Sequence, residues 1–234
     1  HCQVYKGLQS VDQKIATSIR NTRGLILENH EGGILDAVYS ANCGGHSSSN
    51  QNIWVSNPDK HLQGVSDLKN PVKMDLTDHK VAEEFIRNPS DAWCSVAGIE
   101  GANKFRWQKT LGEAEWKKVE EAAGVGRIMS IGEFVREVSG RIISIKLTGS
   151  GGEKTVLREL AIRKLFGMLR SSNFIAEWKR DEEGYMVGAS FMGAGWGHGV
   201  GMCQTGAQSM AKAGYSFDKI LLHYFPGARL KKLY

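Results

Sequence analysis

The sequence predicts an α+β protein of mostly antiparallel sheets, with a central core and an inserted middle lobe over residues 70–157. Short segments of alternating apolar and polar residues recur between turn residues, and helix-period segments are scattered among them. No internal repeat or low-complexity linker interrupts the chain. A chain of 234 residues with 41% hydrophobic residues can bury a sizeable core. No apolar run approaches the roughly 18 residues of a membrane span.

Periodicity and turn residues define the expected elements in chain order. The first part of the chain has a strand over 2–5, a helix over 11–19 with its apolar residues on one face, and a hairpin of 25–28 and 34–40. The middle part has a helix between a Thr77 or Asp78 cap and Asn88-Pro89, a strand over 105–111, a helix over 113–123, and a meander of 128–138, 141–148 and 153–157. The last part has a helix over 160–169, strands over 174–179 and 185–191, helices over 204–213 and 217–224, and an edge strand over 230–234.

The segment 195–204 looks like the centre of the chain, because glycine stands at every second position from its start to residue 201. Glycine tolerates left-handed backbone and lets the chain approach a ligand or another backbone closely. Trp196, His198 and Gln204 add an aromatic face, a titrating ring and an amide at the start of a helix. We predict a pocket wall. A phosphate-binding loop is one alternative, although the Gly-Lys-Ser/Thr ending is missing, and a turn needed only for packing is another.

Two pairs of metal-ligand residues lie at strand ends, His1 with Cys2 and Cys43 with His46. Zinc takes four such groups in a tetrahedron, so these residues predict a zinc site if the fold joins the two segments. A disulfide between Cys2 and Cys43 and inert burial are the alternatives. Cys203 at a helix start is either an activated thiol or a small core residue.

The charge of the chain favours some partners over others. Lys and Arg outnumber Asp and Glu by 30 to 25, and the resulting net charge of +5 is spread along the chain. This dispersion argues against nucleic acid as a partner and suits an anionic glycan, although it is also the ordinary surface of a basic protein.

Several further side chains have both a binding and a structural interpretation. Tryptophans can stack on sugars but more often pack in a core; the candidates are Trp54, Trp93, Trp107 and Trp196. A polar ligand or a solvated helix end would explain Arg163, Arg170, Ser171 and Ser172. No carboxylate adjoins the two histidine-bearing segments, so an acid would have to arrive through folding, with Glu28, Asp36 and Glu177 as candidates.

Five ordered segments closely resemble the SpoIID/LytB family. They are His1-Cys2-Gln3-Val4-Tyr5-Lys6-Gly7 and residues 37–46, 138–141, 169–174 and 195–204, the second containing Asn42-Cys43-Gly44-Gly45-His46 and the last Gly195-Trp196-Gly197-His198-Gly199. The ending, with Gly206-Ala207 and residues 223–227, continues the match. The resemblance covers essentially the whole chain, as a single domain over 1–234 without the family's N-terminal segment.

The resemblance implies a bacterial peptidoglycan lytic transglycosylase of the sporulation type, or a relative such as an amidase enhancer. Such proteins act outside the cytoplasm, in the cell wall, periplasm or spore intermembrane space, on glycan strands stripped of stem peptides. Other cell-wall hydrolases are the implied partners. The family's catalytic acid is a glutamate before the Cys-Gln-Val-Tyr strand, so we expect it upstream of His1. Zinc-dependent members use a cysteine that corresponds to Cys2.

Three functions are therefore expected from the sequence. The first is a lytic transglycosylase domain, the second a glycan-binding or amidase-enhancing module without turnover, and the third a zinc hydrolase centred on His46 and His198. The residues expected to bind glycan are Trp196, Gly197, His198, Gly199, Gln204, Arg170 and Ser171.

Overall fold

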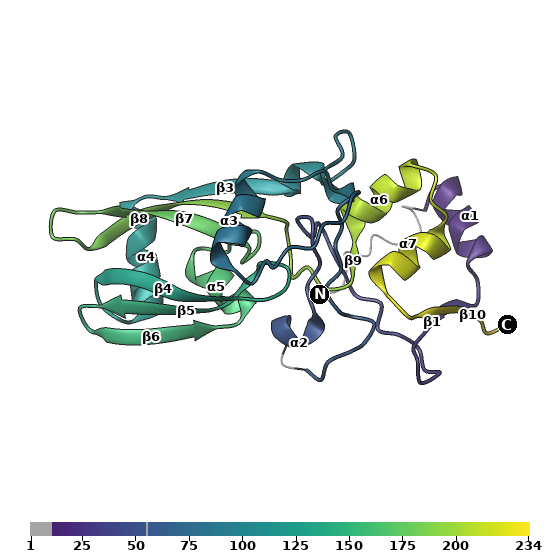
Figure 1. Cartoon of the computed structure of the whole chain (residues 1–234), viewed down its shortest axis with the longest axis horizontal. Coiled ribbons are helices and arrows are strands. Elements are labelled where there is room, and N and C mark those ends of the chain that lie inside the picture. The colour runs from purple at the N-terminus through teal and green to yellow at the C-terminus, as the bar shows by residue number, and fades with distance from the viewer. Residues whose placement is uncertain (1–10, 55) are drawn as a thin grey trace. The chain divides into compact units, whose positions relative to one another are not determined.

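The computed structural model describes residues 11–54 and 56–234, so the expected strand over 2–5 lies outside the described residues. The chain forms two compact units, one of the residues up to Asp36 with Ala228–Tyr234 and the other of Ala37–Gly227. Helices alternate with small, mostly antiparallel sheets (Figure 1), which confirms the α+β prediction. No helix in the described part of the chain is long and apolar enough to cross a membrane.

The smaller unit contains a helix and a two-stranded sheet. α1 (Gln13–Asn21) begins at Asp12, whose carboxylate accepts a 2.8 Å hydrogen bond from the Ile15 amide. This bond satisfies one of the amides that a helix start leaves unpaired. β1 (Leu25–Glu28) pairs antiparallel with β10 (Arg229–Lys232), which confirms a strand at the end of the chain.

The predicted hairpin of 25–28 and 34–40 is wrong in its second strand. β1 meets that segment at one bridge, between Glu28 and Ile34, beside a 2.8 Å bond from the Leu35 amide to the Leu27 carbonyl. Farther on, β2 (Tyr39–Ser40) pairs parallel with β9 (Met202–Cys203) instead. A segment far along the chain supplies the hydrogen-bond partner of this strand, and the local alternation of residues does not indicate that partner.

The larger unit has two antiparallel three-stranded sheets with two helices between them (Figure 1). One sheet has the order β3 (Arg106–Leu111), β8 (Met186–Ala194) and β7 (Phe174–Arg180), and the other is the expected meander of β4 (Ile128–Arg136), β5 (Ile142–Gly149) and β6 (Gly152–Leu157). The helices are α4 (Glu113–Ala123) and α5 (Glu159–Leu165). Trp116, Ile145, Phe166 and Phe191 belong to one core cluster, so both sheets and both helices share a hydrophobic interior.

The remaining elements of this unit are short. They are α2 (Asn50–Ile53), α3 (His79–Arg87), the 3-10 helices η2 (Trp93–Ser95) and η3 (Ala102–Lys104), α6 (Gln204–Lys212) and α7 (Phe217–Tyr224). α3 has the expected Asp78 cap, which accepts hydrogen bonds from the Lys80 and Val81 amides. The inserted lobe over 70–157 stays a prediction; β3, inside that stretch, pairs with β8, outside it.

Replacing Gly193 by Ala should destabilise the larger unit. A Cβ at this position in β8 would lie 2.2 Å from Cζ2 of Trp107 and 2.7 Å from the Asn173 carbonyl oxygen. Overpacking of this kind costs about 1–3 kcal/mol. The matched control is Gly132→Ala in β4, where a Cβ would meet nothing within 4 Å. Urea denaturation should show a lower midpoint for Gly193→Ala alone, and equal midpoints would contradict the packing described.

Candidate functional site

The glycine loop (residues 195–201) runs from β8 to β9, and all its glycines have left-handed backbone. The φ angles are 77° at Gly195, 99° at Gly197, 79° at Gly199 and 71° at Gly201. A Cβ would lie 2.7 Å from the Asn42 oxygen at Gly195, 2.4 Å from Cζ of Arg141 at Gly199 and 2.2 Å from the Val38 oxygen at Gly201. At these three positions the backbone therefore approaches other atoms closely, as the glycine pattern predicts, and those atoms belong to the protein itself rather than to a ligand.

Gly197 differs from the other glycines of the loop. A Cβ there would lie 3.5 Å from Cβ of Ser40, an ordinary contact distance. Its amide donates a 2.9 Å hydrogen bond to the Arg170 carbonyl. Positive φ, rather than crowding, is what requires glycine at this position.

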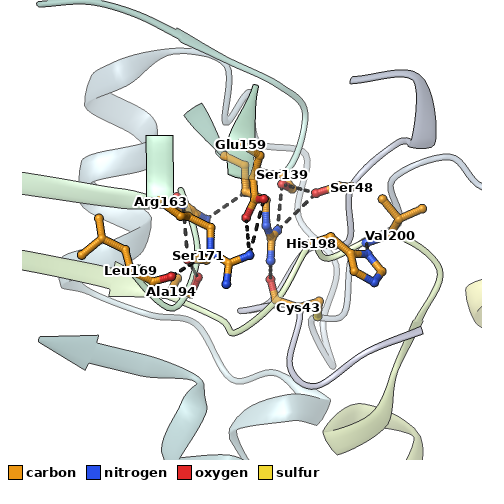
Figure 2. A network of polar contacts seen from close by, with 12 residues as sticks. Cys43, Ser48, Ser139, Glu159, Arg163, Leu169, Ser171, Ala194, His198 and Val200 are labelled. Atoms are coloured by element: carbon orange, nitrogen blue, oxygen red, sulfur yellow. Dashed lines mark hydrogen bonds and ion pairs between the residues drawn. The ribbon is translucent and has the colours of Figure 1, made fainter. Parts of the chain in front are cut away.

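The Arg141 guanidinium is fully buried behind the glycine loop, and Figure 2 shows the groups around it. Nη1 donates hydrogen bonds to Ser48 Oγ at 3.2 Å and to Ser139 Oγ at 3.0 Å, and Nη2 donates to the Cys43 carbonyl at 3.2 Å. The Glu137 carboxylate, also buried, accepts a 2.9 Å bond from Ser48 Oγ. Two serines thus link a buried cation to a buried anion, and these bonds join residues 43–48 to residues 137–141.

His198 is a half-buried ring on the loop. Its centroid lies 4.9 Å from that of the Trp54 ring, and its Nδ1 accepts a 3.1 Å hydrogen bond from the Val200 amide. Burial, and next the Arg141 charge, lowers the pKa of His198 from 6.5 to about 4. The imidazole is therefore neutral near pH 7, and its Nδ1 serves as a hydrogen-bond acceptor.

Trp196 presents the exposed aromatic face of the loop. Trp196 is 39% exposed. The centroid of its ring lies 4.7 Å from Cζ of Arg170 and 5.3 Å from Nζ of Lys104. Hydrogen bonds in both directions with the Asn42 backbone, at 2.8 and 3.2 Å, hold the residue in place. Gln204, at the start of α6, is also exposed. We call Trp196, Arg170, Lys104 and Gln204 the tryptophan surface.

The helix-end residues expected to bind a ligand are mostly internal. Ser171 is fully buried and donates a 2.6 Å hydrogen bond to the Ala194 carbonyl. Arg163 donates to Glu159 at 3.1 Å and to the Leu169 carbonyl at 2.7 Å (Figure 2). Ser172 is buried as well. These three residues support the polypeptide under the loop, whereas Arg170 reaches the tryptophan surface.

The carboxylates considered as acids lie elsewhere. Glu177, on β7, is exposed and 3.8 Å from Arg87. Glu28 pairs with Lys231 in the smaller unit. Glu137 and Glu159, which do enter the network behind the loop, are only 3% and 2% exposed. Burial raises the pKa of Glu159, and Arg163 then Arg141 oppose that effect.

The cysteines are arranged differently from the predicted set. Cys43 lies with Cys94, Cys203 and Asp67, and the ligand atoms of these four buried residues are within 4.8 Å of one another. His46 is not among them; its Nδ1 contacts the Ser47 carbonyl at 2.8 Å. His1 and Cys2 lie outside the described residues, so the zinc set of His1, Cys2, Cys43 and His46 stays a prediction. Cys94 and Asp67 stand apart from every motif in the sequence, so the sequence did not indicate that they join this cluster.

The lowered pKa of His198 predicts a pH-dependent contribution to stability. Between pH 6.5 and about 4 the unfolded chain binds a proton at this residue and the folded chain does not, so stability falls as the pH falls through that range. We expect wild type to lose about 2 kcal/mol more than His198→Gln over this interval. Urea titrations at several pH values measure the difference. Parallel curves for the two proteins would show that His198 titrates normally.

Comparisons with known proteins agree with the resemblance. Residues 48–201 match a family described as a domain of unknown function, DUF8618. The chain is 27% identical to the amidase enhancer of Bacillus subtilis (strain 168), over 97% of this chain and 34% of that protein. It is 25% identical to stage II sporulation protein D of the same organism, over 94% of this chain and 52% of that protein. A third match, stage II sporulation protein D of Bacillus amyloliquefaciens, is 33% identical over 44% of this chain and 27% of that protein.

The chain thus spans between about a third and a half of the first two relatives, with 34% and 52% of their lengths covered. The expected relationship to the sporulation protein and the amidase enhancer is confirmed, and the chain belongs to the family described as DUF8618.

Proposed function

We propose that this chain is a domain of a peptidoglycan lytic transglycosylase, in which the tryptophan surface binds cell-wall glycan strands that have lost their stem peptides. The site of action would be extracytoplasmic, in the cell wall, periplasm or spore intermembrane space. The observation that carries the proposal is the exposed Trp196 ring between Arg170 and Lys104. The relatives named for sporulation and for amidase enhancement support the same cell-wall setting.

The chemistry of the tryptophan surface suits such a strand. An indole ring packs on the apolar face of a pyranose ring, and Trp196, although Arg170 and Lys104 lie over its ring, keeps 39% of its surface exposed for such a contact. Removal of a stem peptide leaves a free lactyl carboxylate on the muramic acid residue. Arg170 and Lys104 would attract this carboxylate beside the stacked sugar, so the same pair of cations would favour denuded strands over peptide-bearing ones.

The cleavage step needs a carboxylic acid. It protonates the glycosidic oxygen, so that the bond from this oxygen to C1 breaks and the next sugar leaves with a free hydroxyl. As carboxylate it then accepts the proton of the 6-hydroxyl while that oxygen bonds to C1 and closes a 1,6-anhydro ring. Glu137 and Glu159 are too deeply buried to reach a glycan. We expect the acid upstream of His1, as the resemblance implies, so the role proposed for the described residues is to bind and orient the glycan strand.

The alternative is a module that binds glycan without cleaving it and assists another cell-wall hydrolase. The match to the amidase enhancer over 97% of this chain favours this second function. A zinc hydrolase centred on His46 and His198 has less support, because Nδ1 of each ring already has a backbone hydrogen-bond partner. Only the ability of histidine to bind zinc suggested this pair of residues.

Substitutions on the tryptophan surface test the binding proposal. Trp196→Ala and Arg170→Ala should each weaken binding to denuded glycan at least about fivefold, or about 1 kcal/mol, in a sedimentation assay. The matched control is Trp93→Ala, which removes another cation-paired tryptophan, 5.6 Å from Lys69. Peptide-bearing glycan should bind less well to wild type, and Arg170→Ala should reduce that preference. Equal binding by Trp196→Ala and wild type would exclude this surface.

Product analysis separates the two functions. Full-length protein that includes this chain is expected to release fragments with 1,6-anhydro ends, one water lighter than hydrolysis products, from denuded strands. Residues 1–234 alone are expected to bind the glycan strands without releasing cleaved fragments from them. Mass spectrometry of the soluble fragments measures both. Release by residues 1–234 would place the acid within them, and no release by the full-length protein would support the non-cleaving module.

A further inference from the structure

The larger unit contains a cluster of ligand-type side chains that the proposed function does not use. Cys43, Cys94, Cys203 and Asp67 come from four different segments, and all four are fully buried. We propose that this cluster binds one zinc ion in a closed, four-coordinate structural site. The site differs from the set expected from sequence, with which it shares only Cys43.

The spacing of the ligand atoms fits the ion. A tetrahedral zinc with bonds of about 2.3 Å to sulfur holds its sulfurs about 3.8 Å apart. The Sγ atoms of Cys43 and Cys94 are 3.7 Å apart, and no pair of ligand atoms in the cluster exceeds 4.8 Å. Side-chain movements of about 1 Å or less would therefore bring the set to coordination distance.

Backbone amides already favour the thiolate form of Cys203. Its Sγ accepts hydrogen bonds from the Cys43 amide at 3.2 Å and from the Gly206 amide at 3.4 Å. The second amide belongs to the first turn of α6, for which Cys203 is the N-cap. Thiolate is the form that binds metal, and hydrogen bonds from backbone amides to the sulfur are typical of metal-ligating cysteines.

Asp67 is held in place as firmly as the cysteines. Its Oδ1 accepts a 2.6 Å hydrogen bond from the Tyr224 hydroxyl, and its Oδ2 accepts a 3.1 Å bond from the Cys94 amide. A Cβ on Gly206 would lie 2.2 Å from that hydroxyl and 2.9 Å from the carboxylate, so the surroundings are tightly packed. Oriented second-shell partners of this kind are what keep a carboxylate ligand in a fixed position.

A bound cation would offset the negative charge of the cluster. A buried carboxylate beside three sulfurs is costly unless positive charge is near. The Arg106 guanidinium, whose Nη1 donates a 2.9 Å bond to the Gly44 carbonyl, interacts electrostatically with Cys43 and Cys94. His223 Nε2 lies 3.7 Å from Asp67 Oδ1, beyond hydrogen-bond distance. A divalent ion among the four ligands would neutralise two of their negative charges directly.

Zinc at this position would join the segments that carry the candidate site. Cys43 belongs to the polar segment bonded to Arg141, Cys94 to η2, and Cys203 to β9, which follows the glycine loop. All four ligands come from protein, so no coordination position is left for a substrate. The expected role is structural, with the metal loaded during folding because the ligands have no exposure in the folded chain.

Metal analysis of the full chain, purified without chelators, tests the proposal. Wild type is expected to carry about one zinc per chain by inductively coupled plasma and native mass spectrometry. Cys94→Ser and Cys203→Ser should lose that equivalent, and the control variants Cys2→Ser and His46→Ala should keep it. Metal retained in both Cys94→Ser and Cys203→Ser, or lost in Cys2→Ser but kept in Cys94→Ser, would overturn the assignment.

Two measurements on wild type remain decisive if a cysteine variant fails to fold. Cobalt loaded in place of zinc should give the strong charge-transfer absorption of thiolate ligands, and removal of zinc by a chelator should lower the melting temperature until zinc is restored. Alkylation of the denatured chain should find Cys43, Cys94 and Cys203 all reduced. A disulfide among these three in metal-free wild type would refute the site.

Discussion

The buried guanidinium of Arg141 is the constraint on which the candidate site depends. A charge with no exposure to water is costly, so each of its hydrogen-bond partners must stay in place. Those partners are a carbonyl of the Cys43 segment and the hydroxyls of Ser48 and Ser139. Gly199 lies against the same group and leaves no room for a Cβ. The buried Arg141 guanidinium therefore determines the path of the glycine loop.

This constraint separates two layers in the candidate site. Arg141, Glu137, Ser171 and Arg163 form an inner layer of side chains whose hydrogen bonds go to other protein groups. The tryptophan surface forms the outer layer, with an exposed ring and two neighbouring cations. His198 lies between the layers as a neutral ring. The ligand contacts proposed above belong to the outer layer, whose geometry depends on the inner one.

Local sequence pattern predicted the elements that local interactions determine. α4 and α7 have the bounds that apolar periodicity and capping indicated, and the meander of β4, β5 and β6 follows from short turns between alternating segments. Pairing between distant segments was not predictable, because one extended segment accepts many partners. The parallel pairing of β2 with β9 is such a case. Burial was hidden for the same reason: Ser171 and Arg170 are neighbours in sequence, yet one is internal and the other reaches the surface.

The pairing of β2 with β9 also determines when the site can form. The Cys43 amide donates a hydrogen bond to the sulfur of Cys203, and the two residues are 160 positions apart in the chain. Closing a loop of that length costs conformational entropy before any contact compensates for it, and such non-local contacts slow folding. During synthesis the meander and its helices emerge complete while β9 is still to come. The tryptophan surface is therefore a late product of folding, assembled on a core that is already built.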